Sequence, residues 1–171
     1  DPDSKNIQFL LKTSTASPFF AEFGWASADA AQPMPKSDSV WTASSMVLSP
    51  GSPVTLIWEN GNGLTFRRQL SINDDYMITV DESVESALSA PLTLFPYGLV
   101  RRHGTPATTG IYILHEGALG VFDETLREED YDDMRDADGG VSEIRPEMPG
   151  GWIGFTDKYW LVALIPDADK R

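Results

Sequence analysis

The chain has 171 residues, 41% of them hydrophobic, which is enough apolar material for the core of a single domain. Asp and Glu number 26 against 13 Lys and Arg, and the net charge of −13 argues against binding to nucleic acids or anionic lipid surfaces. Cysteine is absent, which excludes disulfides, thiol nucleophiles and Cys-ligated zinc.

Short apolar runs between turn residues predict β-strands in the first part of the chain. We expect strands at residues 7–11 and 19–23, followed by a surface loop at 26–39 that is rich in Ala, Ser, Asp and Pro. The first five residues show no signal-peptide pattern, so an exported protein would have its targeting segment outside this chain.

Three consecutive strands are predicted next, at residues 54–59, 64–72 and 76–84. The Asn-Gly-Asn-Gly stretch at 60–63 is a strong hairpin signal, because Asn and Gly accept positive φ at low cost. In the second strand the even-numbered positions are apolar except for Arg68, and this period of two is typical of a half-buried antiparallel strand. Tyr76, Ile78 and Val80 are expected on one face of the third strand.

Shorter strands are predicted at residues 92–100, 111–114 and 119–122. Pro96 suggests that the first of these is an edge strand or contains a bulge, since proline cannot donate to a ladder. The stretch 125–136 reads as a helix with Thr125 and Glu128 as a capping box, and an exposed strand or a loop is the alternative.

The most apolar stretch, residues 150–166, is too short for a bilayer-spanning helix, which needs about 20 apolar residues. Asp157 and Lys158 also interrupt it, and each charge would cost roughly 2.5–3.5 kcal/mol at a helix centre. Two strands at 152–155 and 159–165, joined by a turn at these two charges, fit better. With roughly nine strands and at most one short helix, the chain is predicted to be an all-β sandwich.

An acidic run contains the spacing Asp136-x-Asp138-Gly139, which resembles part of a calcium-binding loop. Aligned as such a loop, its first and twelfth ligands would be Met134 and Arg145, and neither side chain can serve. A solvated acidic surface explains the run better, and we expect no metal site.

Two histidines are present, His103 and His115, and Glu116 follows the second. A histidine and a carboxylate in a cleft can do acid–base chemistry, but neighbours on a strand point to opposite faces. Ordinary polar residues at strand ends are the favoured interpretation. Nucleophile motifs and phosphate-binding loops are also missing, so we expect a protein that is not an enzyme and has no cofactor.

The only compact basic cluster is Arg101-Arg102-His103. In so acidic a chain it is a weak candidate for docking a carboxylate-bearing partner, because guanidinium groups bind carboxylates bidentately. The same cluster could instead pair with the protein's own acids, and the sequence leaves both alternatives open.

The decapeptide at 151–160, Gly-Trp-Ile-Gly-Phe-Thr-Asp-Lys-Tyr-Trp, resembles a segment of the large periplasmic domain of YidC-type membrane protein insertases. Further stretches resemble the α-proteobacterial version of that domain, and they occur in the expected order: residues 20–25, 54–66, 97–99, 102–106 and 113–117. The resemblance covers nearly the whole chain.

This resemblance implies a β-supersandwich similar to that of the galactose mutarotases, mostly antiparallel. It implies a single periplasmic domain over residues 1–171, itself a fragment of a larger domain. The parent protein would be anchored in the bacterial inner membrane, and its membrane-spanning insertion core would lie outside this chain. Trp152, Phe155, Tyr159 and Trp160 would fill the sandwich, with Asp157 and Lys158 at a turn.

By the same resemblance, the domain would be a non-catalytic scaffold or docking module in membrane protein insertion and folding. Its partners would be the Sec translocon with its ancillary subunits, or nascent membrane proteins, which could add to an edge strand such as the one containing Pro96. A chaperone-like apolar groove is a related possibility. The alternative is a sugar-binding or mutarotase-like protein, which would need His103 or His115 to meet a carboxylate in a concave sheet.

Overall fold

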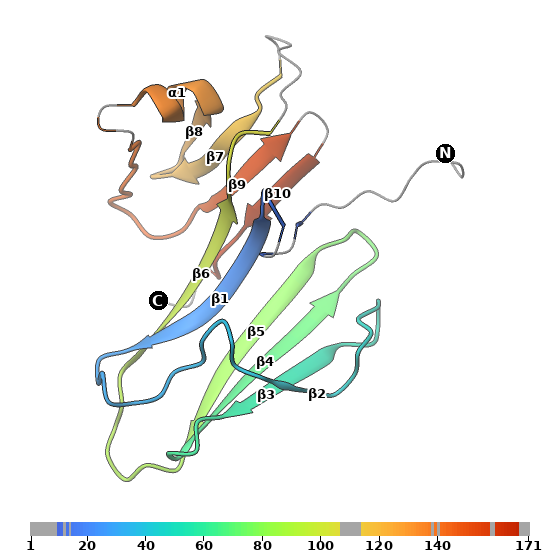
Figure 1. Cartoon of the computed structure of the whole chain (residues 1–171), viewed down its shortest axis with the longest axis vertical. Coiled ribbons are helices and arrows are strands. Elements are labelled where there is room, and N and C mark those ends of the chain that lie inside the picture. The colour runs from blue at the N-terminus through green and yellow to red at the C-terminus, as the bar shows by residue number, and fades with distance from the viewer. Residues whose placement is uncertain are drawn as a thin grey trace. The chain divides into compact units, whose positions relative to one another are not determined.

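A computed structural model describes residues 10–11, 13, 15–106, 114–137, 139, 141–157 and 160–167 (Figure 1). The chain divides into two compact units: a central unit, Phe23–Tyr97, and a terminal unit made of Asp1–Glu22 and Gly98–Arg171. The elements of the described residues are β1 (Phe19–Ser27), β2 (Thr42–Ala43), β3 (Val54–Glu59), β4 (Leu64–Ile72), β5 (Ile78–Ser86), β6 (Leu94–Arg102), β7 (Gly117–Phe122), β8 (Thr125–Asp130), α1 (Tyr131–Asp136), β9 (Trp152–Asp157) and β10 (Trp160–Leu164).

The central unit contains an antiparallel sheet with the strand order β2-β3-β4-β5. The predicted hairpin between β3 and β4 is confirmed: Asn60 Oδ1 accepts hydrogen bonds from the backbone N–H groups of Asn62 and Leu64, at 2.7 and 2.9 Å. Gly61 and Gly63 have φ values of 69° and 89°, which side-chain-bearing residues rarely adopt. The Asn side chain and two glycines therefore set the register of these strands.

Aromatic side chains form the core of the central unit. Phe66 is completely buried, and the centroids of the Trp25 and Trp58 rings lie 5.1 and 5.5 Å from the centroid of its ring. Leu64 is 2% exposed on the same strand. The predicted alternation along β4 is therefore confirmed, and its even-numbered residues face the core.

The strand β5 begins two residues later than predicted. Asn73 Oδ1 accepts hydrogen bonds from the N–H groups of Asp75 and Met77, and these hold a turn in which Tyr76 has a φ of 62°. Tyr76 is 85% exposed, so its predicted place on a strand face beside Ile78 is wrong. The Asn73 side chain extends the turn beyond the length that the sequence pattern suggested.

The terminal unit contains a second antiparallel sheet, with the order β10-β9-β7-β8. The predicted helix over 125–136 is wrong in its first half, which is β8. Asp123 and Glu124 both have positive φ, so they form a two-residue turn that pairs Phe122 with Thr125. The helix α1 is six residues long, and its N-cap is the Asp130 side chain instead of Thr125.

The predicted C-terminal hairpin is present as β9 and β10, but it differs from the prediction in two respects. Trp160 is 43% exposed, so it does not fill the core, whereas Phe155 is partly buried and packs edge-on against Phe19 with ring centroids 5.8 Å apart. Asp157 belongs to β9 instead of the turn. The predictions for Lys158 and Tyr159 lie outside the described residues.

The other predicted strands agree in part. Among 7–11 only residues 10 and 11 are described, and Leu11 forms a β-bridge with Phe19. Residues 111–113 lie outside the described chain, and Leu114 is an exposed bend residue. The strand β6 does contain Pro96 and pairs with β1 in a two-stranded sheet.

Antiparallel sheets with one short helix thus make up the described chain, and the predicted all-β, mostly antiparallel fold class is confirmed. Each unit contains one four-stranded antiparallel sheet. No helix within the described residues has the length and apolar character needed to cross a bilayer.

Candidate docking surface

Arg102 of the predicted basic cluster forms an ion pair within the terminal unit. Its Nη1 atom lies 2.6 Å from Asp157 Oδ2 and 2.7 Å from Oδ1, and it donates a hydrogen bond to the Tyr131 hydroxyl at 2.9 Å. The Arg102 side chain is 13% exposed. For this residue the structure therefore favours pairing with the protein's own acid.

Aromatic rings enclose the same guanidinium group. The Cζ atom of Arg102 lies 4.3 Å from the centre of the Phe19 ring and 5.9 Å from that of Tyr131, both within cation–π distance. Burial, and secondarily the Asp157 carboxylate, raise the pKa of Tyr131 to about 12, although the charge of Arg102 acts in the opposite direction. The hydroxyl therefore stays protonated at neutral pH and can both accept from Arg102 and donate to Asp157.

The two neighbours of Arg102 face solvent. Arg101 and His103 are exposed, and the His103 ring stacks on the Phe20 ring, with ring centroids 6.3 Å apart. The His103 backbone N–H donates a hydrogen bond to the Pro18 carbonyl at 2.8 Å, which fixes the end of β6. Arg102 thus points inward, whereas Arg101 and His103 are exposed.

The central unit contains a comparable arginine, Arg68, which lies outside the predicted basic cluster. Arg68 pairs with Glu82 at 2.6 Å, and its Nη2 also donates to the Phe23 carbonyl at 2.6 Å. The Cζ atom lies 5.6 Å from the Trp25 ring centre and 5.2 Å from that of Trp41. A sequence signal existed, because Arg68 occupies an even position on the otherwise apolar face of β4.

Both burial and the neighbouring Arg68 affect the pKa of Glu82. Burial raises the pKa of its carboxyl above the ordinary value of 4.5, and the charge and hydrogen bond of Arg68 lower it by a smaller amount. The pair lies directly across two neighbouring strands, since Arg68 and Glu82 are register partners in β4 and β5. It is a structural pair, with side chains 15% and 13% exposed.

The other candidate chemistries find little support. The Nε2 atom of His115 lies 3.0 Å from the Ala118 carbonyl oxygen. Asp138 of the predicted calcium motif is outside the described residues, and Asp136 is a highly exposed residue at 4.0 Å from Arg135. Across the part of the chain that the structure describes, no three metal-ligating side chains come together.

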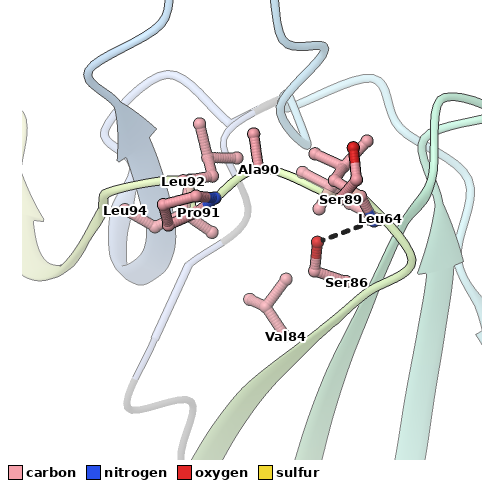
Figure 2. A pocket seen from close by; sticks show the side chains of 9 residues that line it. Leu64, Val84, Ser86, Ser89, Ala90, Pro91, Leu92 and Leu94 are labelled. Carbon is pink, nitrogen blue, oxygen red and sulfur yellow. Dashed lines mark hydrogen bonds between the residues drawn. The ribbon is translucent and has the colours of Figure 1, made fainter.

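A small cavity lies in the central unit at the end of β5 (Figure 2). Its volume is about 280 Å³, and polar atoms contribute about as much of its surface as apolar atoms do. Nine residues line it: Leu64, Val84, Ser86, Leu88, Ser89, Ala90, Pro91, Leu92 and Leu94. The Ser86 hydroxyl oxygen accepts a hydrogen bond from the Leu88 N–H at 3.2 Å, so it is already engaged within the loop. Neither histidine lines this cavity, and none of its lining residues is ionisable.

The outer strands of the two four-stranded sheets differ in character. β8 is a charged edge with Arg127, Glu128 and Glu129, as expected of an edge protected from unwanted pairing. β10 is apolar, and its Trp160 and Leu161 are 43% and 52% exposed. β5 is the longest of these outer strands, with nine residues, and it is acidic.

Antiparallel sheets and one short helix define the described chain as an all-β domain. The chain belongs to the family described as the YidC periplasmic domain, whose model matches residues 1–171. This confirms the predicted family and the predicted location on the periplasmic side of the bacterial inner membrane.

Curated relatives carry the name membrane protein insertase YidC. The protein from Methylorubrum extorquens is 45% identical over 98% of this chain and 28% of its own length. Those from Methylobacterium nodulans and Nitrobacter hamburgensis are 47% and 42% identical, over 98% and 100% of this chain and 28% of their own lengths. The chain thus spans less than a third of these relatives.

Proposed function

We propose that this chain is a non-catalytic docking module of a membrane protein insertase, forming one periplasmic domain over residues 1–171 within a larger parent. The observation that carries the proposal is the family match over the whole chain, together with relatives named as insertases. The partners would be the Sec translocon with its ancillary subunits, and nascent membrane proteins.

Arg101 and His103 are the residues of the basic cluster that a partner can reach, because both are exposed at the end of β6. Arg102 supports them from inside, since its ion pair with Asp157 joins the end of β6 to the end of β9. A carboxylate-bearing partner would therefore meet two cationic or hydrogen-bonding groups on a firmly held strand end.

Crosslinking in membranes tests this proposal. A photo-reactive amino acid at position 101 of the full-length parent should give adducts with translocon subunits or with a translating membrane protein. The same amino acid at Asp38, an exposed residue of the polar loop, is the matched control and should give fewer adducts. Equal adducts from both positions, or none from position 101, would contradict docking through this cluster.

The sugar-binding alternative requires a histidine and a carboxylate in one cleft. The described contacts of His103 and His115 are to the Phe20 ring and the Ala118 carbonyl, and the cavity of the central unit is lined by other residues. No observation favours this alternative, and we do not propose it.

A further inference from the structure

The outer edge of β5 is a long backbone edge that does not pair with another strand of the described residues. β5 pairs with β4 over all nine of its residues, from Ile78 to Ser86. It is the last strand of its sheet, and no strand within the described ranges pairs with its other side. A free strand edge presents alternating N–H and C=O groups, which are the groups an added strand would bind.

The acidic side chains of β5 limit which strands can pair with its free edge. Asp81 and Glu85 are exposed and lie on the face opposite the core, because Glu82 and Val84 face inward. The Glu85 side chain remains 66% exposed even though it pairs with Arg67. A second copy of β5 would bring like charges together, whereas a basic segment would be attracted.

The inward face of the same strand leads to the cavity (Figure 2). Val84 and Ser86 of β5 form one wall, and the loop that follows, including Ala90 and Leu92, forms the other. A strand added beside Val84 would place alternate side chains on the same face of the sheet as this cavity, since alternate residues of a strand share a face. Seven of the nine lining residues have apolar side chains and none is ionisable, so the cavity can accept an aliphatic side chain.

We propose that the free edge of β5 and the adjoining cavity bind an extended segment of a partner protein whose one face is basic and whose other face is apolar. The segment has basic residues four positions apart, opposite Asp81 and Glu85, and an aliphatic residue next to one of them, opposite Val84. This proposal rests on the proposed docking function and specifies one site and the chemistry of the segment bound there.

A designed peptide is the probe: acetylated and fluorescein-labelled Thr-Lys-Leu-Thr-Leu-Lys-Thr amide, whose alternation fits either strand direction. Binding to the 171-residue chain is measured by fluorescence anisotropy. A peptide with both lysines replaced by glutamate, and one of the same composition without alternation, should each bind at least tenfold more weakly. Equal binding of all three peptides would overturn the proposal.

Backbone pairing is tested with two N-methylated peptides, one methylated at odd and one at even positions. In an added strand only alternate N–H groups face the neighbouring edge. One pattern should therefore lose binding by at least tenfold, and the other should stay within a few-fold of the parent peptide. Equal losses would exclude strand addition.

Protein variants locate the site. Ala90→Phe fills the cavity from its exposed loop and should weaken binding about tenfold, because the buried leucine loses its place. Asp81→Lys should weaken it about fivefold. Asp75→Lys makes the same charge change in the turn before β5 and should have little effect. If Asp75→Lys weakens binding as much as Asp81→Lys, the attraction is non-specific and the site is wrong.

Different results would contradict the proposed docking function and the proposed β5 site. Absence of peptide binding, with position-101 crosslinks intact, would remove the β5 site and leave the docking function. Peptide binding as expected, without translocon or substrate adducts in membranes, would support the β5 site and contradict the proposed partners. Circular dichroism of each variant checks that the sheets are retained, and Asp81→Lys keeps the test valid if Ala90→Phe does not fold.

Discussion

Each unit of the protein contains one arginine that points inward from a strand, and the two differ in how they are supported. Arg68 in the central unit and Arg102 in the terminal unit are similarly buried, at 15% and 13% exposed. Both pair with a carboxylate and lie over aromatic rings. The carboxylates differ: Glu82 is 13% exposed, whereas Asp157 is 31% exposed.

The exposure of the carboxylate affects how much stability each unit loses when its ion pair is broken. A buried pair is costly to break, because removing one partner leaves an uncompensated charge away from water. Asp157 can be hydrated more readily than Glu82 if its arginine is removed, and Tyr131 still offers it a hydrogen bond, at 3.4 Å. We therefore expect the central pair to be the more sensitive of the two.

Arg68→Ala has the largest expected effect. It should lower the free energy of unfolding by about 3–5 kcal/mol, because Glu82 is left without its counter-ion in a mostly buried position. The measurement is urea unfolding followed by tryptophan fluorescence, since Trp25 and Trp41 border the arginine.

Two variants control this experiment. Arg67→Ala removes the neighbouring arginine, whose pair with Glu85 is exposed, and should cost less than about 1 kcal/mol. The double variant Arg68→Met with Glu82→Leu should recover most of the lost stability, because apolar side chains replace both charges. If the double variant is as unstable as Arg68→Ala, the rings and the Phe23 carbonyl bond matter more than the charge pair.

Arg102→Ala is expected to cost about 2 kcal/mol, less than the change at Arg68. Arg101→Ala is the matched control on the opposite face of β6 and should change stability by no more than about 0.5 kcal/mol. A loss at Arg102 that exceeds the loss at Arg68 would contradict the ranking by carboxylate exposure.

The same two arginines show how far the sequence could predict this structure. The alternation along β4 and the Asn-Gly turn were sufficient to place Arg68 on a core-facing strand, because both signals are local. Its partner Glu82 lies on the next of the three consecutive predicted strands, so the sequence is sufficient to predict the pair. The sequence predicts the start of the helix too early, because the two-residue turn at Asp123 and Glu124 needs positive φ at both positions and contains no glycine to signal it.

The sequence alone does not predict the partner of Arg102. Its partner Asp157 lies 55 residues away, and the strands between them are not arranged in a simple meander. Its role depends on which strand ends meet, and this is a property of the topology.

The pH dependence of stability sharpens the comparison further. The pKa of Glu82 is raised above 4.5 by burial, so the folded chain binds a proton more readily than the unfolded chain. The stabilising contribution of this titration is fully present below 4.5 and is lost as the pH rises through the folded pKa. Relative to Glu82→Gln, which does not titrate, the unaltered protein should therefore lose stability as the pH rises from below 4.5 through the folded pKa. A difference that is constant with pH would contradict the raised pKa.

The smallest expected effect is that of Tyr131→Phe, about 1 kcal/mol, because only the hydroxyl between Arg102 and Asp157 is removed. The pKa of Tyr131 is raised to about 12 from 10.0, so the stability linked to its proton is fully present below 10.0 and is lost as the pH rises through about 12. The advantage of the unaltered protein over Tyr131→Phe in urea unfolding should thus be constant up to about pH 10 and shrink above it. Tyr76→Phe, at an 85% exposed turn residue, should leave stability unchanged. If the two variants behave alike, the hydroxyl does not support the Arg102 pair, and the terminal unit relies on the guanidinium and the carboxylate alone.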